Sequence, residues 1–238
     1  MTKRPMTSAA NGWLRGIVKS VKGPMMSFVA ISFAGFAFAA AESAPAVQTA
    51  TPQEIKSYFR QSGMQVLTFA GYSGAGYENT DRMLAEATAI LERYDPKKTI
   101  VNIGATPDGI GAVYPLAHKK GFRTTGIVST QARDNNVPLS PSVDRIFYVP
   151  DETWGGYMAG TRRLSPTSLA MVESSDVIVA IGGGDVARDE MTAAKELGKE
   201  VRFLPADMNH QKAIDTARRK GAQEPTDFRG SAAAAFAR

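Results

Sequence analysis

The stretch DVIVAIGGGDVARDEM, from Asp176 to Met191, joins an apolar run to three glycines and then to an acidic segment. Almost wholly apolar runs of β-branched residues are typical of strands that are buried on both faces. The glycines permit a tight turn, and the residues from Val186 to Leu197 have the spacing of an amphipathic helix. The stretch therefore predicts a strand, a glycine turn and a helix that carries Glu190.

Two earlier segments, 65–95 and 98–130, repeat this scheme of strand, glycine turn and helix. The first predicted helix has one apolar stripe, formed by Met83, Leu84, Ala87, Ile90, Leu91 and Tyr94. Further helices are predicted at 52–63, 161–175 and 209–221, and further strands at 144–150 and 198–207. Alternating strands and helices predict an α/β fold, a Rossmann-like open parallel sheet with helices on both faces, over residues 53–225.

The 238-residue chain is long enough for one sizeable core, and its formal charge is +5. Residues 1–41 hold five basic residues and no acid, which leaves 23 basic and 23 acidic residues in the remainder. A neutral domain of this kind does not indicate a nucleic acid polymer as partner.

The N-terminal segment has the pattern of an export signal: a basic stretch, the apolar run 24–41 and an Ala-Ala-Ala sequence before Glu42. We expect residues 1–41 to direct export to the periplasm or the medium; the alternative is an uncleaved membrane anchor. Residues 42–52 are predicted to be a flexible linker, and residues 226–238 a mobile tail. The sequence has no cysteine and no ligand-like spacing of its two histidines, so no metal site is predicted.

The three glycine turns are predicted to meet at the carboxyl edge of the sheet, where open α/β sheets bind ligands. Bare backbone N–H groups and helix N-termini at such turns favour a phosphate. The candidate residues for binding a nucleotide or ribosyl phosphate are Gly71, Ser73, Gly74, Gly104, Thr106, Gly109, Gly111, Gly182, Gly183, Gly184 and Asp185. The alternative is that the glycines only permit tight turns.

Two cofactor motifs are weighed against this pattern. GGGDVA formally fits the dinucleotide motif G-x-G-x-x-A, but it occurs late in the chain and lacks a well-placed acid about 20 residues further on. The motif G-x-x-x-x-G-K-[ST] is absent. We therefore expect no cofactor.

Glu190 lies on the predicted helix face that should pack on the sheet, whereas Arg188 and Asp189 are expected to be solvated. A carboxylate on a buried face must be paired or face a ligand, because burying it alone is costly. Trp154 and Tyr157, flanked by glycines, are candidates for a lid that stacks on a base. The alternative for both is an aromatic anchor of a surface loop.

Three segments resemble the SLOG superfamily, and within it the LOG group of nucleoside monophosphate phosphoribohydrolases. They are VLTFAGYSG (66–74), NIGATPDGIGAVYPLAHKKGFRTTGIV (102–128) and SSDVIVAIGGGDVARDE (174–190). The resemblance covers about residues 65–221 and places the family's final glutamate on Glu190. It implies cleavage of the N-glycosidic bond of a nucleoside 5′-monophosphate, and a homodimer.

The sequence departs from the family pattern at two places. Val186 and Ala187 stand where the family has Gly-Thr, and the family's Arg-Lys pair falls on Thr167 and Ser168. The nearest basic residues are Arg162 and Arg163; of these, Arg163 is the candidate to act with Glu190. Three functions remain open: hydrolysis at the N-glycosidic bond, binding of a nucleotide-derived ligand without chemistry, and a structural or interaction role.

Overall fold

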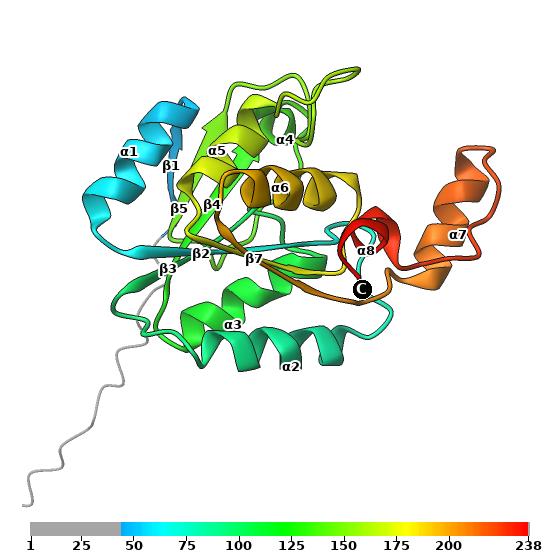
Figure 1. The fold of residues 1–238 in the computed structure, drawn as a ribbon, viewed down its shortest axis with the longest axis horizontal. Helices are drawn as coiled ribbons and strands as arrows, with labels where there is room; N and C mark the ends of the chain where they lie inside the picture. Colours follow the sequence, from blue (N-terminus) through cyan, green and yellow to red (C-terminus); the bar gives the residue numbers. More distant parts are fainter. Residues whose placement is uncertain (1–43, 238) are drawn as a thin grey trace, which may run out of the picture. The chain divides into compact units, whose positions relative to one another are not determined.

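A computed structural model describes residues 44–237 of the chain, which form a seven-stranded sheet with helices on both faces (Figure 1). All neighbouring strands are parallel, and their order is β1-β5-β4-β3-β2-β6-β7. The strands are β1 (Ala46–Thr49), β2 (Gln65–Gly71), β3 (Thr99–Ile103), β4 (Arg123–Ser129), β5 (Arg145–Val149), β6 (Val177–Ile181) and β7 (Glu200–Leu204). The predicted Rossmann-like open parallel sheet is confirmed.

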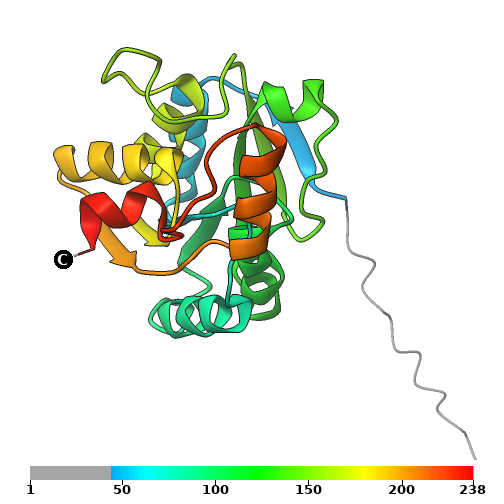
Figure 2. The same cartoon turned by 90° about the vertical axis from the view of Figure 1, so that its right-hand side faces the viewer.

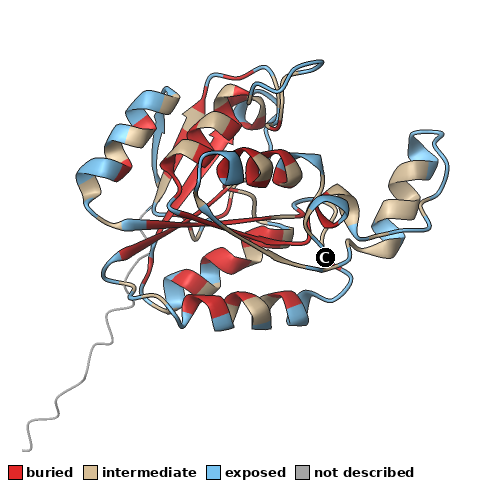
Figure 3. Ribbon diagram, viewed as in Figure 1, coloured by how far each residue is buried: buried red, intermediate tan, exposed pale blue. Residues whose placement is uncertain are grey.

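The helices lie in two layers. α1 (Pro52–Ser62), α5 (Pro166–Ser174) and α6 (Asp185–Glu196) cover one face, and α2 (Thr80–Leu91) and α3 (Val113–Lys119) cover the other (Figure 1). The remaining helical segments are η1 (Gly109–Ala112), α4 (Thr130–Asp134), α7 (His210–Arg219) and α8 (Gly230–Phe236). Buried residues concentrate in the sheet and on the inward helix faces, whereas α7 has none (Figure 3).

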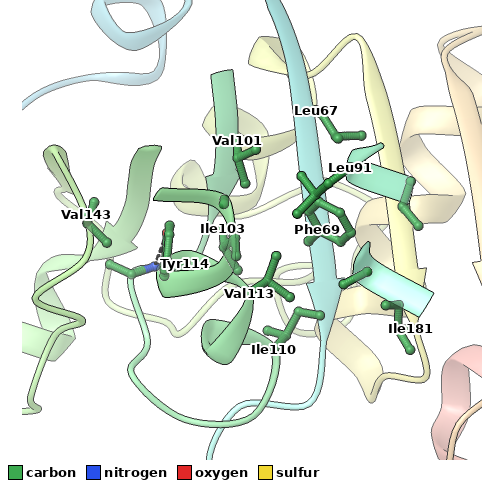
Figure 4. Close-up of a cluster of buried hydrophobic side chains, with 14 of the residues drawn as sticks. Leu67, Phe69, Leu91, Val101, Ile103, Ile110, Val113, Tyr114, Val143 and Ile181 are labelled. Carbon is green, nitrogen blue, oxygen red and sulfur yellow. Dashed lines mark hydrogen bonds between the residues drawn. The ribbon is translucent and has the colours of Figure 1, made fainter. Parts of the chain in front are cut away.

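The largest core cluster lies between the sheet and the α2–α3 layer (Figure 4). Alternate residues of β2, Leu67 and Phe69, belong to this cluster, together with Tyr114 of α3. All residues of β3 and β6 are buried, as their apolar sequences predicted. The α2 stripe is also confirmed, because Met83, Ala87, Ile90 and Leu91 are buried.

Local sequence signals explain where several helices begin and end. Thr51 and Glu54 form a reciprocal capping box at the start of α1, and Gly63 ends the helix with a φ of +64°. Pro166 occupies the first turn of α5, where its missing N–H costs no hydrogen bond. α5 therefore begins after Arg162 and Arg163, which the sequence had placed inside a helix.

Two segments predicted to be flexible are ordered elements. Within the predicted linker 42–52, β1 pairs in parallel with β5 at the edge of the sheet. Within the predicted tail 226–238, α8 packs on α6 and buries Ala232 and Ala233. Both were missed for a physical reason: β1 is exposed along its length and needs no apolar pattern, and alanines pack closely without a marked hydrophobic period.

The predicted export segment, residues 1–41, lies outside the described residues. Among residues 44–237, no helix has the length and apolar character needed to cross a membrane.

Candidate functional site

A cavity of about 400 Å³ opens at the carboxyl edge of the sheet, as the convergence of the turns predicted. The first glycine turn contributes Gly71, Ser73 and Gly74, and the second contributes Gly104 and Thr106. The opposite wall consists of Trp154, Thr167 and Met171 and of the first turns of α6 with Val186, Ala187 and Glu190. Most of the other lining side chains are apolar.

Glu190 lines this cavity from the second turn of α6, and only 5% of its surface is exposed. Its Oε1 accepts a hydrogen bond of 2.6 Å from the Ser168 hydroxyl, and no described residue hydrogen-bonds its Oε2. Burial raises the pKa of Glu190 to about 7, aided by the charge of Asp189 and opposed by the Ser168 hydrogen bond. Ser168 therefore holds one oxygen of a carboxyl group that lines the cavity, and the other oxygen has no hydrogen-bond partner among the described residues.

The neighbour of Glu190 corrects one prediction. Asp189 was expected to be solvated, but only 6% of its surface is exposed. Its Oδ1 accepts bonds from the Arg188 guanidinium, and its Oδ2 accepts a 2.9 Å bond from the Tyr157 N–H. The predicted apolar face of α6 is also corrected at its ends, because Val186 and Leu197 are exposed. The helix begins at the mouth of the cavity and ends in solvent, so neither terminal residue packs on the sheet.

The position of the family's basic pair carries two hydroxyl residues that lie at the site. Thr167 lines the cavity, and the Ser168 hydroxyl donates a hydrogen bond to Glu190. Arg162 instead pairs with Glu196, and the guanidinium of Arg163 lies 3.4 Å from the sulfur of Met158. Neither arginine lines the cavity, so the structure does not bring Arg163 to the wall where Glu190 lies.

Among the described residues that line the cavity, the charged ones are all acids. These are Asp108 and Glu190, and no lysine, arginine or histidine contributes to the wall. One feature favours an anion: the N-cap residue of α6, Gly184, provides no side-chain cap, and Val186 and Ala187 in the first turn lie at the wall. Among residues 44–237, no group of three metal-ligating side chains is present.

The two candidate lid residues differ in position. Trp154 lines the cavity with 54% of its surface exposed, as a lid residue would. Tyr157 does not line it; its hydroxyl is buried without a hydrogen-bond partner, and its backbone bridges to Leu164. Tyr157 therefore fits the alternative of an anchor for the loop.

The third glycine turn is covered by the chain itself. The Gly183 carbonyl accepts a 3.1 Å bond from the N–H of Ala232 in α8, and Gly182 lies against the ring of Tyr72. Gly182, Gly183, Gly184 and Asp185 accordingly do not line the cavity, and Asp185 pairs with Arg188. Gly109 and Gly111 are likewise outside the lining; a Cβ on them would collide with the backbone of Tyr72 and Thr106, respectively.

Three residues with a part in this arrangement were missed from the sequence: Tyr72, Ser168 and Asp189. The Tyr72 hydroxyl donates to the carbonyl of Arg229 at 2.6 Å, which ties the first turn to the C-terminal segment. A contact across more than 150 residues leaves no periodic signal. For Ser168 a signal existed, because the family's basic pair falls on it.

The chain is similar in structure to several solved proteins. One is TM1055, a structural genomics target (18% identity, covering 58% of this chain and 72% of that one, TM-score 0.43). Another is the molybdenum cofactor carrier protein from Chlamydomonas reinhardtii (17%, 72% and 95%, TM-score 0.43). A third is the molybdenum cofactor binding protein from the phototrophic bacterium Rippkaea orientalis (21%, 67% and 86%, TM-score 0.43). No protein-family model matches the chain, and no curated protein does. At these values the likeness concerns the fold alone, and the fold class rests on the strand order given above.

Proposed function

We propose that this protein binds a nucleoside or nucleoside monophosphate in the carboxyl-edge cavity without cleaving it. The observation that carries the proposal is the buried Glu190, which has one oxygen bonded to Ser168 and the other without a partner among the described residues, in a cavity that Trp154 also lines. A buried acceptor of this kind requires a donor, and the hydroxyl groups of a ribose provide donors.

The size and walls of the cavity fit such a ligand. Small-molecule sites commonly measure roughly 300–1,000 Å³ and combine apolar walls with a few polar groups. An exposed tryptophan at the rim offers a face for a base, and base–aromatic stacking is worth roughly 1–3 kcal/mol. The uncapped start of α6 can accept one anionic group, but acidic lining residues disfavour a polyphosphate.

The residues that stand at the position of the family's Arg-Lys pair favour binding without hydrolysis. Thr167 and Ser168 are neutral, so no side-chain cation at the wall would balance a dianionic phosphate or assist departure of the base. Arg163, which the sequence assigned to this role, lies outside the wall.

Hydrolysis of the N-glycosidic bond is the second candidate, and one observation favours it. Burial raises the pKa of Glu190 to about 7, so near neutral pH the group exists in both forms and could exchange a proton. Its carboxylate form could also stabilise positive charge developing on the sugar.

The test follows binding and cleavage in the same samples. The protein is incubated with adenosine, guanosine, cytidine, uridine and their 5′-monophosphates; melting temperature and free base are both measured. We expect at least one ligand to raise the melting temperature by mass action with no base released. Glu190→Gln should weaken this stabilisation, and Glu86→Gln, on the far layer in α2, is the matched control.

The outcomes separate the candidates. Base release that Glu190→Gln abolishes would establish the hydrolase, and a panel without any thermal shift would remove the nucleoside proposal.

We also propose that residues 1–41 direct export of this domain, either as a cleaved signal or as an anchor. The mass of the protein recovered from cell-envelope and periplasmic fractions tests this.

A further inference from the structure

The loop 151–164, which carries Trp154, is fixed at two adjacent points just behind that residue. The Gly156 N–H donates to the Ser168 hydroxyl at 2.7 Å, and the Tyr157 N–H donates to Asp189 Oδ2 at 2.9 Å. Gly155 and Gly156 have φ values of +119° and +82°, a conformation that other residues rarely adopt. The two bonds therefore hold a turn whose geometry depends on glycine.

The Ser168 hydroxyl, which is the first of these two anchor points, also contacts Glu190. Ser168 accepts from Gly156 and at the same time donates to Glu190 Oε1 at 2.6 Å. Ser168, Asp189 and Glu190 are all buried, so water does not compete for these bonds. A continuous chain of hydrogen bonds thus runs from the cavity wall to the backbone of the Trp154 loop.

We propose that Ser168 is a positioning residue that couples the state of Glu190, ionised or neutral, ligand-bound or free, to the placement of Trp154 over the cavity. The proposal rests on the ligand site proposed above and extends it. The ligand is then one that donates a hydrogen bond to Glu190 and presents a flat ring to Trp154, so both contacts form together.

The direction of the coupling follows from bond strength. A hydroxyl bonds a carboxylate more strongly than a neutral carboxyl group, so the loop is held more firmly when Glu190 is charged. Of the charged groups nearby, Asp189 lies on the same helix and is balanced by Arg188, Asp151 caps the start of α5 by accepting from Thr167, and Asp108 faces the cavity from the second turn. None of the lining groups is a cation that would keep Glu190 ionised at low pH.

The test uses fluorescence of the full-length chain without any ligand. The sequence has two tryptophans, so Trp13→Phe leaves Trp154 as the only one. Its emission is followed from about pH 5 to about pH 9, a range that brackets the raised pKa of Glu190, about 7. We expect a single sigmoidal change with its midpoint near neutral pH.

Three variants in the Trp13→Phe background decide the interpretation. Glu190→Gln keeps an acceptor for Ser168 but cannot titrate, so the transition should disappear. Ser168→Ala should remove most of its amplitude and move any remainder to higher pH, because the Ser168 bond lowers the pKa of Glu190. Ser174→Ala is the matched control: this serine is buried on the same helix, its hydroxyl has no partner, and the transition should be unchanged.

A transition that survives in Glu190→Gln, an emission that does not change with pH, or a full transition in a folded Ser168→Ala variant would overturn the coupling. If Ser168→Ala folds poorly, Ser168→Cys, whose thiol is a weaker hydrogen-bond donor, takes its place and should reduce the amplitude. Because no ligand is present, this result stands apart from nucleoside binding: a thermal shift without the transition would keep the proposed function and remove the coupling.

Discussion

The first two glycine turns and the third are all rich in glycine but have different surroundings. Ser73 and Gly74 of the first turn and Gly104 and Thr106 of the second line the cavity. The third turn, Gly182 to Gly184, follows β6 at the same edge of the sheet but is covered by Tyr72 and by α8, which lies beside α6 in both views (Figures 1 and 2).

This difference shows that a glycine-rich turn predicts that other atoms come close to the backbone. It does not predict whether those atoms belong to a ligand or to the same chain. At Gly74 in the first turn the neighbour is open space, since nothing lies within 4 Å of a Cβ placed there, although Gly71 at the start of this turn lies against Tyr77. At Gly182 in the third turn the neighbours are atoms of the same chain, the Tyr72 ring at 2.5 Å and the Ala206 carbonyl at 2.8 Å from a Cβ placed there; Gly184, at the end of this turn, has nothing within 4 Å. Only a glycine with open space beside it, such as Gly74, leaves its backbone available to a ligand.

The largest expected effect comes from adding a methyl group to each kind of turn. Gly182→Ala places a Cβ against Tyr72 and backbone at a φ of +59°, so we expect a loss of about 3 kcal/mol in the free energy of unfolding. Gly74→Ala, the matched control, should change it by less than about 0.5 kcal/mol. Urea denaturation measures both, and equal effects would mean that the two turns do not differ as described.

The second prediction concerns pH and Glu190. Its folded-state pKa, about 7, lies above the ordinary value of 4.5, so the folded state binds this proton more tightly than the unfolded state. The stability that this carboxyl contributes is full below pH 4.5 and is lost as pH rises to about 7, a change on the order of 3 kcal/mol. Unfolding free energies of the wild type relative to Glu190→Gln should fall across this window. A constant difference would show that Glu190 titrates normally.

Much of this comparison was accessible from the sequence. Apolar strands, helix stripes and glycine turns predicted the parallel sheet and the edge where the cavity lies, because each signal is local or periodic. Glu190, which the sequence singled out as an acid on an apolar helix face, lines this cavity, and Ser168 bonds it. The cover over the third turn could not be predicted, since it depends on the Tyr72 hydroxyl meeting the Arg229 carbonyl far along the chain. The burial of Asp189 was missed because its partner is a backbone N–H in an irregular loop.

The third prediction concerns Tyr72, which holds the C-terminal segment over the third glycine turn. Tyr72→Phe removes the hydroxyl that bonds the Ala206 and Arg229 carbonyls, and we expect a loss of about 1–2 kcal/mol. Amide hydrogen exchange at Ala232, whose N–H bonds the Gly183 carbonyl, should accelerate. Tyr94→Phe is the control, because no described residue hydrogen-bonds its hydroxyl. Unchanged protection of Ala232 would show that Tyr72 does not hold α8 in place.

The smallest effect is expected at Arg163. Arg163→Ala should leave the thermal shift given by any binding nucleoside unchanged, to within about 0.5 kcal/mol of binding free energy, because this side chain lies outside the cavity wall. A loss comparable to that of Glu190→Gln would restore Arg163 to the site and argue for the hydrolase.

The most direct test of the account maps a bound nucleoside onto the three turns by amide chemical shifts. The ligand giving the largest thermal shift is titrated into isotope-labelled protein. We predict shifts at Ser73, Gly74 and Thr106 and at the Trp154 indole, with Gly182 and Gly183 unchanged. Shifts confined to Gly182–Gly184, with Trp154 unaffected, would contradict the claim that the first two turns form the binding site and the third is closed.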